Sequence, residues 1–125
     1  MPDEGLTLMA TGDLVLEMPD ANPYFSNVKS TLKTADIVVG QGEVVFTDRP
    51  APFEDSHAPP CDPRNMNALK NAGFHVITLA GNHVYDSGRP GIEDTIRGLN
   101  DLGIATVGAG LNISEHSGDR QGIHR

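Results

Sequence analysis

The stretch Leu79-Ala-Gly-Asn-His-Val-Tyr-Asp-Ser-Gly88 joins an apolar run, Phe74 to Leu79, to a segment with helical periodicity. Between them, the residues are polar and include Asn82, His83 and Asp86. A short apolar run followed by such a turn and a helix predicts a buried strand that ends at the carboxyl edge of a sheet. Open α/β sheets bind their ligands at that edge, so this stretch is the first candidate for a functional site.

Two other apolar runs also end in polar residues. Leu6 to Ala10 leads into Thr11-Gly12-Asp13, which we interpret as a turn, and the β-branched run Ala35 to Gly40 leads into Gln41-Gly42-Glu43. The carboxyl ends of parallel strands share one edge, so we expect Asp13 and Glu43 to lie near the Asn82-His83 pair.

Converging carboxylates repel each other unless they are protonated or bound to a cation. Oxygen and nitrogen donors suit Mn, Fe, Zn or Mg, so Asp13, Glu43 and Asn82 are candidate ligands of a divalent metal. A two-metal centre could hold a phosphate or other ester and activate water for in-line attack. His83 would then donate a proton to the leaving oxygen.

Each of these residues also has an alternative interpretation. Asp13 could be a turn residue or a helix cap, and Glu43 a solvated carboxylate at a strand edge. Asn82 could occupy a left-handed turn, and His83 could be a hydrogen-bonded loop histidine. Asp86 is expected to cap the next helix in either case, and could also orient His83.

The remaining pattern alternates strands with helices and predicts an α/β fold of parallel βαβ units with right-handed crossovers. Thr47 to Pro60 is rich in Pro and is expected to be a long, functional loop. The polar stretch 114–125 reads as a tail after a domain spanning 1–113. Capping residues and apolar spacing predict three helices: Tyr24–Thr34 with Asn22 as its cap, Asp62–Ala72 ended by Gly73, and Gly91–Leu102 ended by Gly103. The last predicted strand is Ile104–Val107.

Composition excludes several classes of protein. A net charge of -8 argues against non-specific nucleic-acid binding. A single cysteine, Cys61, excludes an intrachain disulfide and a multi-cysteine zinc site, and we interpret it as a small buried or loop residue whose thiol pKa a helix N-terminus could lower. His57 and His75 are interpreted as structural. No membrane span or basic-then-apolar leader is present, which predicts a cytoplasmic protein or one separated from its leader.

The order and spacing of four motifs resemble the CapA family of capsule-synthesis proteins. Those proteins are implicated in poly-γ-glutamate capsule production and are related to calcineurin-like metallophosphoesterases. The resemblance covers about residues 6 to 112, and its most specific element is the Asn-His-x-x-Asp-x-Gly turn. The motifs are Gly12-Asp13, Asp36-Ile-Val-Val-Gly-Gln-Gly-Glu43, Ala72-Gly-Phe-His-Val-Ile-Thr-Leu-Ala-Gly-Asn-His83 with Asp86 and Gly88, and Gly103-Ile-Ala-Thr-Val-Gly-Ala-Gly110 with Asn112.

The resemblance implies a two-sheet αββα sandwich with a dinuclear metal centre acting on a phosphate-ester or polyglutamate-related substrate. It implies that Asp13 and Asn82 are metal ligands, that Glu43 is a bridging or second-metal ligand, and that His83 is the catalytic acid. Family members are often extracytoplasmic and membrane-anchored. Gln41-Gly42 stands where the family commonly has Asn-Leu, and the later His-x-His motif of the family has no counterpart.

The sequence therefore predicts one half of a metallophosphoesterase-type sandwich, with one sheet face open. An open apolar face favours a homo-oligomer or a partner segment. Two functions remain: a CapA-like metal-dependent phosphoesterase, catalytically incomplete as this chain, or a non-catalytic module that acts in assembly of a capsule-synthesis complex. A nucleotide-binding domain is disfavoured, because Thr11-Gly12-Asp13 lacks the glycines of a phosphate loop.

Overall fold

The computed structural model describes residues 5–51 and 58–112. The predicted tail, the domain boundary at 113 and His57 lie outside these ranges. In chain order the elements are β1 (Leu8–Leu14), η1 (Asn22–Phe25), α1 (Lys29–Leu32), β2 (Ile37–Gly42), η2 (Pro63–Asn65), α2 (Met66–Ala72), β3 (Val76–Thr78), α3 (Gly88–Asp101) and β4 (Ala105–Val107), where η1 and η2 are 3₁₀ helices.

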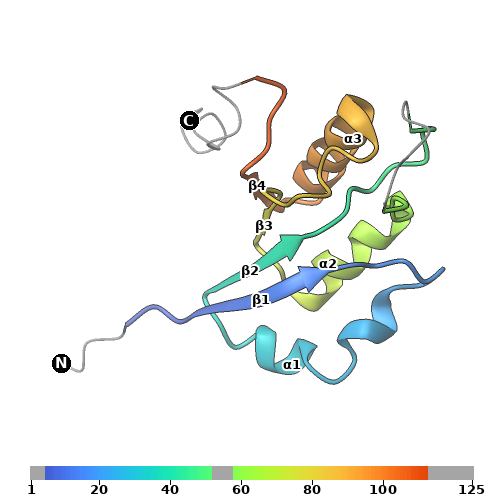
Figure 1. The fold of residues 1–125 in the computed structure, drawn as a ribbon. Helices are drawn as coiled ribbons and strands as arrows, with labels where there is room; N and C mark the ends of the chain where they lie inside the picture. Colours follow the sequence, from blue (N-terminus) through green and yellow to red (C-terminus); the bar gives the residue numbers. More distant parts are fainter. Residues whose placement is uncertain (1–4, 52–57, 113–125) are drawn as a thin grey trace.

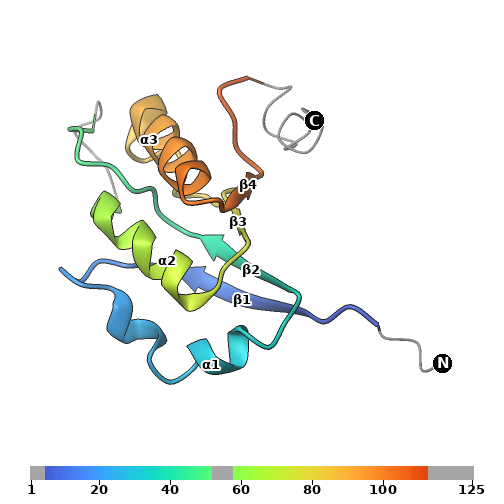
Figure 2. The same cartoon turned by 180° about the vertical axis from the view of Figure 1, so that it is seen from behind.

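The four strands form one parallel sheet in the order β1-β2-β3-β4, which confirms the predicted α/β fold of βαβ units. Strands that follow one another in space as they do in sequence place right-handed crossovers on a single face of the sheet. Figures 1 and 2 show this arrangement: α2 and α3 lie behind the strands in one view and in front of them in the other. The described chain therefore covers one face of the sheet.

Burial alternates along the strands accordingly. Residues that point toward the helices are almost fully buried, such as Val38 and Ile77, both 0% exposed. Their neighbours Val39 and Val76 on the open face are only half-buried. We call these the covered face and the open face. The open face comprises Leu8, Ala10, Asp13, Ile37, Val39, Gln41, Val76, Thr78, Ala105 and Val107.

A β-bulge places Asp13 on the open face. Ala10 pairs with Val39 and Asp13 pairs with Gln41, so two residues of β1 oppose the single Gly40 of β2. Without the extra residue, strict alternation from Leu8 would turn Asp13 toward the helices. The predicted turn at 11–13 and the helix-cap alternative for Asp13 are therefore wrong, because β1 continues through this segment to Leu14.

Two predicted helices end where their glycines indicated. Gly73 closes α2 with a left-handed φ of 96°, and its N–H bonds back to the Leu69 and Lys70 carbonyls. Asp62 caps the entry to η2 and α2 by accepting a hydrogen bond from the Arg64 N–H. Gly103, with φ 77°, follows α3. These positions confirm the expected capping chemistry.

The helix expected over Tyr24–Thr34 is wrong, because the segment forms η1 and α1 as separate short pieces. Asn22 does not cap η1, since Ala21 occupies that position and Asp20 Oδ1 accepts the Asn22 N–H at 3.0 Å. Only Phe25 and Leu32 of the expected apolar stripe are buried. The polar and β-branched residues between them have low helix propensity, and two buried anchors are too few to override it.

Side chains set two further features of the core. His75 Nδ1 accepts the Val38 N–H at 2.9 Å beside the start of β3, which confirms the structural interpretation of this histidine. Cys61 is buried beside the loop that leaves β2, and Phe46 and Cys61 form an isolated parallel bridge. Burial raises the pKa of the Cys61 thiol, so the alternative of a thiol activated by a helix N-terminus is wrong.

No helix among residues 5–51 and 58–112 has the length and apolar character to cross a membrane.

Candidate functional site

The ends of β2 and β3 bring Glu43 and His83 together. Glu43 directly follows β2, and His83 lies in the turn that joins β3 to α3. His83 Nε2 lies 3.9 Å from Glu43 Oε1, and the His83 and Glu43 side chains are 30% and 19% exposed. This arrangement places an imidazole and a carboxylate at the carboxyl edge of the sheet, where the strand pattern predicted them.

Asp86 holds the other nitrogen of the His83 ring. Asp86 Oδ2 lies 2.7 Å from His83 Nδ1. An ionised carboxylate only accepts hydrogen bonds, so this contact makes Nδ1 the protonated nitrogen of the neutral ring and turns Nε2 toward Glu43. A direct contact therefore supports the predicted orienting role of Asp86.

Asp86 does not cap α3, contrary to expectation. Ser87 occupies the N-cap position, and no side-chain hydrogen bond caps the helix. The Asp86 carboxylate is already engaged, because the same Oδ2 atom that faces His83 also accepts the Ala58 N–H at 3.1 Å. Two donors on one oxygen orient this carboxylate toward the histidine instead of the helix terminus.

Gly81 leaves room for the side chains of β2. A Cβ atom at this position would lie 2.9 Å from Gln41 Nε2 and 3.6 Å from Glu43 Oε2. Gln41 therefore reaches the turn that carries His83, even though Gln-Gly replaces the Asn-Leu pair common in the family that the sequence resembles. A side chain at this position would displace the flexible end of Gln41, whereas its distance to Glu43 would be an ordinary contact.

Asp13 and Asn82 are both exposed. Asn82 does not adopt the left-handed alternative, since no non-glycine residue of the described chain has a positive φ. Within residues 5–51 and 58–112, no group of three or more His, Cys, Asp or Glu side chains is placed to hold a metal ion.

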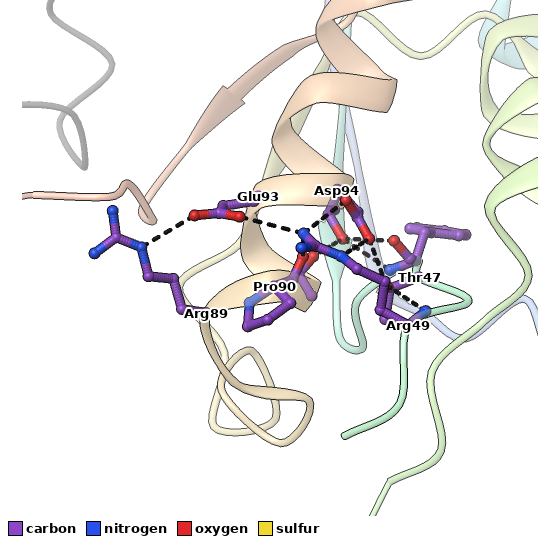
Figure 3. Close-up of polar contacts among 9 residues, drawn as sticks. Thr47, Arg49, Arg89, Pro90, Glu93 and Asp94 are labelled. Carbon is purple, nitrogen blue, oxygen red and sulfur yellow. Dashed lines mark hydrogen bonds and ion pairs between the residues drawn. The ribbon is translucent and has the colours of Figure 1, made fainter. Parts of the chain in front are cut away.

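A polar network fastens the loop after β2 onto the start of α3 (Figure 3). Thr47 Oγ1 donates to Asp94 Oδ2 at 2.6 Å. The Arg49 guanidinium bonds both oxygens of Asp94, at 2.9 and 2.8 Å, and also the Pro90 carbonyl at 2.8 Å. Hydrogen bonds from Arg49, and secondarily from Thr47, lower the pKa of the Asp94 carboxyl. This network fixes the segment that follows Glu43 against the helix that follows His83.

Sequence reasoning missed the hydrogen bonds from Arg49 to Asp94 and the one from the Ala58 N–H to Asp86. Arg49 lies 45 residues from Asp94, and Ala58 contributes a backbone group, which residue type does not reveal. One ion pair of this region could have been predicted from the sequence. Arg89 and Glu93 have the i, i+4 spacing of a helical ion pair, and their side chains are joined at 3.0 Å.

A hollow of about 700 Å³ lies away from the residues predicted to form the site. It lies between the loops after β1 and β2 and the start of α2, with Glu17, Met18, Asp48 and Asp62 among its lining residues. None of the five predicted site residues lines it. The hollow is therefore distinct from the turn that carries His83.

Comparison with known proteins decides the family. The model of the family described as "Bacterial capsule synthesis protein PGA_cap" matches residues 7–119. The chain belongs to the PGA_cap family. The match includes every strand and helix described above and all five predicted site residues. It confirms the resemblance that the Asn-His-x-x-Asp-x-Gly turn indicated.

Curated relatives agree with this assignment to PGA_cap. The chain is 31% identical to the capsule biosynthesis protein CapA of Bacillus anthracis over 90% of its own length, and 24% identical to the PGA biosynthesis protein CapA of Bacillus subtilis over 90%. It is 36% identical to a probable polyglutamine synthesis accessory protein of Mycobacterium tuberculosis over 79%. These alignments cover 30%, 32% and 23% of the respective relatives, so the chain spans less than a third of their length.

The fold fits this membership. Four parallel strands with helices on one face are consistent with one half of a metallophosphoesterase-like sandwich. The matching family is described by capsule synthesis, and the Bacillus anthracis relative is named for capsule biosynthesis.

Proposed function

We propose that this chain carries part of a metal-dependent phosphoesterase-type centre that serves poly-γ-glutamate capsule synthesis, with His83 as its proton donor. One observation carries the proposal: Asp86 holds His83 Nδ1 at 2.7 Å, and Nε2 faces Glu43 at 3.9 Å. A histidine oriented by a carboxylate, with its second nitrogen directed to the edge of the sheet, has the arrangement of a general acid. Membership of the PGA_cap family supports the link to capsule synthesis.

His83 would act through both ring nitrogens. The Asp86 carboxylate accepts the Nδ1–H and stabilises the positive charge when the ring is protonated. The Nε2–H is then donated to the leaving oxygen of the substrate, and the ring returns to its neutral form. Glu43 lies 3.9 Å from Nε2, so the proton would leave His83 on the side of the ring that faces the Glu43 loop.

We propose that Asp13, Glu43 and Asn82 contribute to a mono- or dinuclear site for Mn, Fe, Zn or Mg, completed by ligands beyond the described residues. Their oxygen donors suit these metals. Bound there, a divalent ion would polarise a phosphoryl oxygen and lower the pKa of a bound water. The substrate class would be a phosphate ester or a polyglutamate-related molecule, and a relative named for PGA biosynthesis supports the second of these.

The test is turnover of p-nitrophenyl phosphate with added Mn²⁺, for the chain and its variants. We expect His83→Ala to lower the rate about 10²-fold or more, as removal of a general acid does. Asp13→Ala is expected to lower it as well, while Asp101→Ala, at the far end of α3, serves as the matched control. Unchanged turnover in both site variants would overturn the assignment.

A second function is favoured by the open face and by the lack, among the described residues, of three His, Cys, Asp or Glu side chains grouped to hold a metal ion. In this alternative the chain is a non-catalytic module that assembles with other parts of a capsule-synthesis complex, and a second copy or a further segment covers the open face. Calorimetry that detects no divalent binding to the folded chain would support it. Stoichiometric metal in the purified protein would exclude it.

A further inference from the structure

The loop between Glu43 and α2 returns to the candidate site. Its last part begins at Ala58, whose N–H donates to Asp86 Oδ2 at 3.1 Å. The same oxygen receives the His83 Nδ1–H at 2.7 Å. A backbone group of one loop and a histidine of another therefore share a single acceptor atom, on a side chain that is only 18% exposed.

The described first part of the loop, up to residue 51, is held against α3. Arg49 binds Asp94 and the Pro90 carbonyl near the start of α3, as Figure 3 shows. Near its other end, the Cys61 N–H bonds the Val45 carbonyl at 2.9 Å. With both described ends attached, the loop presents the Ala58 N–H to Asp86 at a defined place.

We propose that the Ala58 backbone N–H is a positioning group for His83. A carboxylate held only by the imidazole could rotate with it, because both side chains belong to the same short turn. A second donor from a separate segment fixes the plane of the carboxylate, and the carboxylate then fixes the ring and its Nδ1–H tautomer. The functional part of this inference rests on the proposed role of His83 as proton donor.

A proline at position 58 removes this donor and adds no polar group. We compare Ala58→Pro with Ala58→Gly, which keeps the N–H, by two-dimensional ¹⁵N–¹H NMR of the imidazole nitrogens in the whole chain. The original protein and Ala58→Gly should show His83 with a protonated Nδ1. In Ala58→Pro the fraction of the Nε2–H tautomer should rise about fivefold, as expected for one lost hydrogen bond.

A reciprocal measurement keeps the test sharp, since proline also restricts the backbone before it. Asp86→Ala removes the acceptor, and exchange of the Ala58 amide hydrogen with solvent should accelerate about fivefold. Equal His83 spectra in the proline and glycine variants, or unchanged Ala58 exchange in Asp86→Ala, would overturn the inference.

Turnover separates this inference from the proposed function. If Ala58→Pro shifts the His83 tautomer but the chain has no activity that depends on His83, the positioning contact stands and the proposed function fails. If His83→Ala abolishes turnover while Ala58→Pro leaves the NMR spectrum of His83 unchanged, the proposed function stands and the positioning role fails.

Discussion

The two faces of the sheet are built from alternate residues of the same strands but differ in burial and in chemistry. On the covered face, Val38 and Ile77 are 0% exposed and pack into one core with the helices. On the open face, Leu8 is 60% exposed and Val39 is half-buried. Asp13 lies on the open face, where a bulge has turned it.

This difference assigns separate tasks to the two faces. The covered face holds the apolar contacts that stabilise the chain, so changes there should be costly at any protein concentration. Sheets made only of parallel strands are almost always covered on both sides. The open face therefore suits a second layer, and polar residues at its carboxyl edge remain accessible for chemistry.

The largest expected effect comes from cutting into the covered face. Ile77→Ala should lower the free energy of unfolding by about 2–5 kcal/mol, because it leaves a cavity in the middle of the core. Val39→Ala on the open face should cost less than ~1 kcal/mol in dilute solution. Urea denaturation of both variants measures the difference.

The same pair of variants tests what covers the open face. If a second copy covers it, the cost of Val39→Ala should grow with protein concentration while that of Ile77→Ala stays constant. Light scattering on the same samples gives the oligomeric mass. Equal losses for the two variants in a monomeric chain would contradict the distinction between the faces.

The second expected effect concerns a hydroxyl behind the covered face. Thr95 is 0% exposed, accepts the Phe46 N–H at 2.8 Å and donates to the Gly91 carbonyl at 2.7 Å. Thr95→Val keeps the volume but leaves the buried Phe46 N–H without its acceptor, which should cost about 1–3 kcal/mol. Thr78→Val, on the open face, is the matched control. A loss as small as that of the control would show that water satisfies the Phe46 N–H.

The features that the sequence predicted depend on short-range patterns. Alternating apolar runs and turns indicated the parallel sheet, and Gly73 and Gly103 indicated where two helices end. The contact between His83 and Asp86 was accessible for the same reason, because three residues separate them within one turn. Each of these features depends on residues that are close to one another in the chain, so it can be predicted from a single sequence.

The features that it missed depend on distant groups. The bulge before Asp13 is defined by its pairing with β2, and without that pairing the segment reads as a Gly-Asp turn. Asn65 was unremarkable in sequence, yet its side chain binds the Ala21 N–H and the Leu16 and Met18 carbonyls, which fixes the loop after β1. Each of these contacts joins segments whose proximity only the complete fold establishes.

The third expected effect is a pH dependence of the free energy of unfolding, caused by the ion pair between Arg49 and Asp94. Arg49 lowers the pKa of Asp94 below its ordinary 3.8, so the folded chain favours the ionised form. This contribution to stability is complete above the unfolded pKa and is lost as the pH falls from about 4 through the folded pKa. The stability gap between the original chain and Asp94→Asn should therefore narrow in acid, as urea titrations at pH 6, 4 and 3 would measure. A gap that stays constant down to pH 3 would contradict the ion pair.

The smallest expected effect compares two buried hydroxyls, that of Ser87 at the N-cap of α3 and that of Thr95 in the middle of the helix. Thr95 has its partners, whereas Ser87 Oγ is buried with no hydrogen-bond partner in the described chain and does not cap the helix. Ser87→Ala should therefore be neutral or raise the free energy of unfolding by up to ~1 kcal/mol, since it removes a polar atom that gained nothing on burial. Thermal and urea unfolding would measure it.

Ser87→Thr is the informative counterpart, because it keeps the hydroxyl and adds a methyl group. The space is tight there: a Cβ at Gly91 would lie 2.9 Å from the Ser87 Cβ and 2.8 Å from Val45 Cγ2. The threonine should therefore destabilise the chain by about 1–3 kcal/mol through overpacking. If Ser87→Ala instead proves as costly as Thr95→Val, a water or another group must satisfy Ser87. The turn that carries His83 would then be held by a polar contact on its buried side, in addition to the one between Asp86 and Ala58.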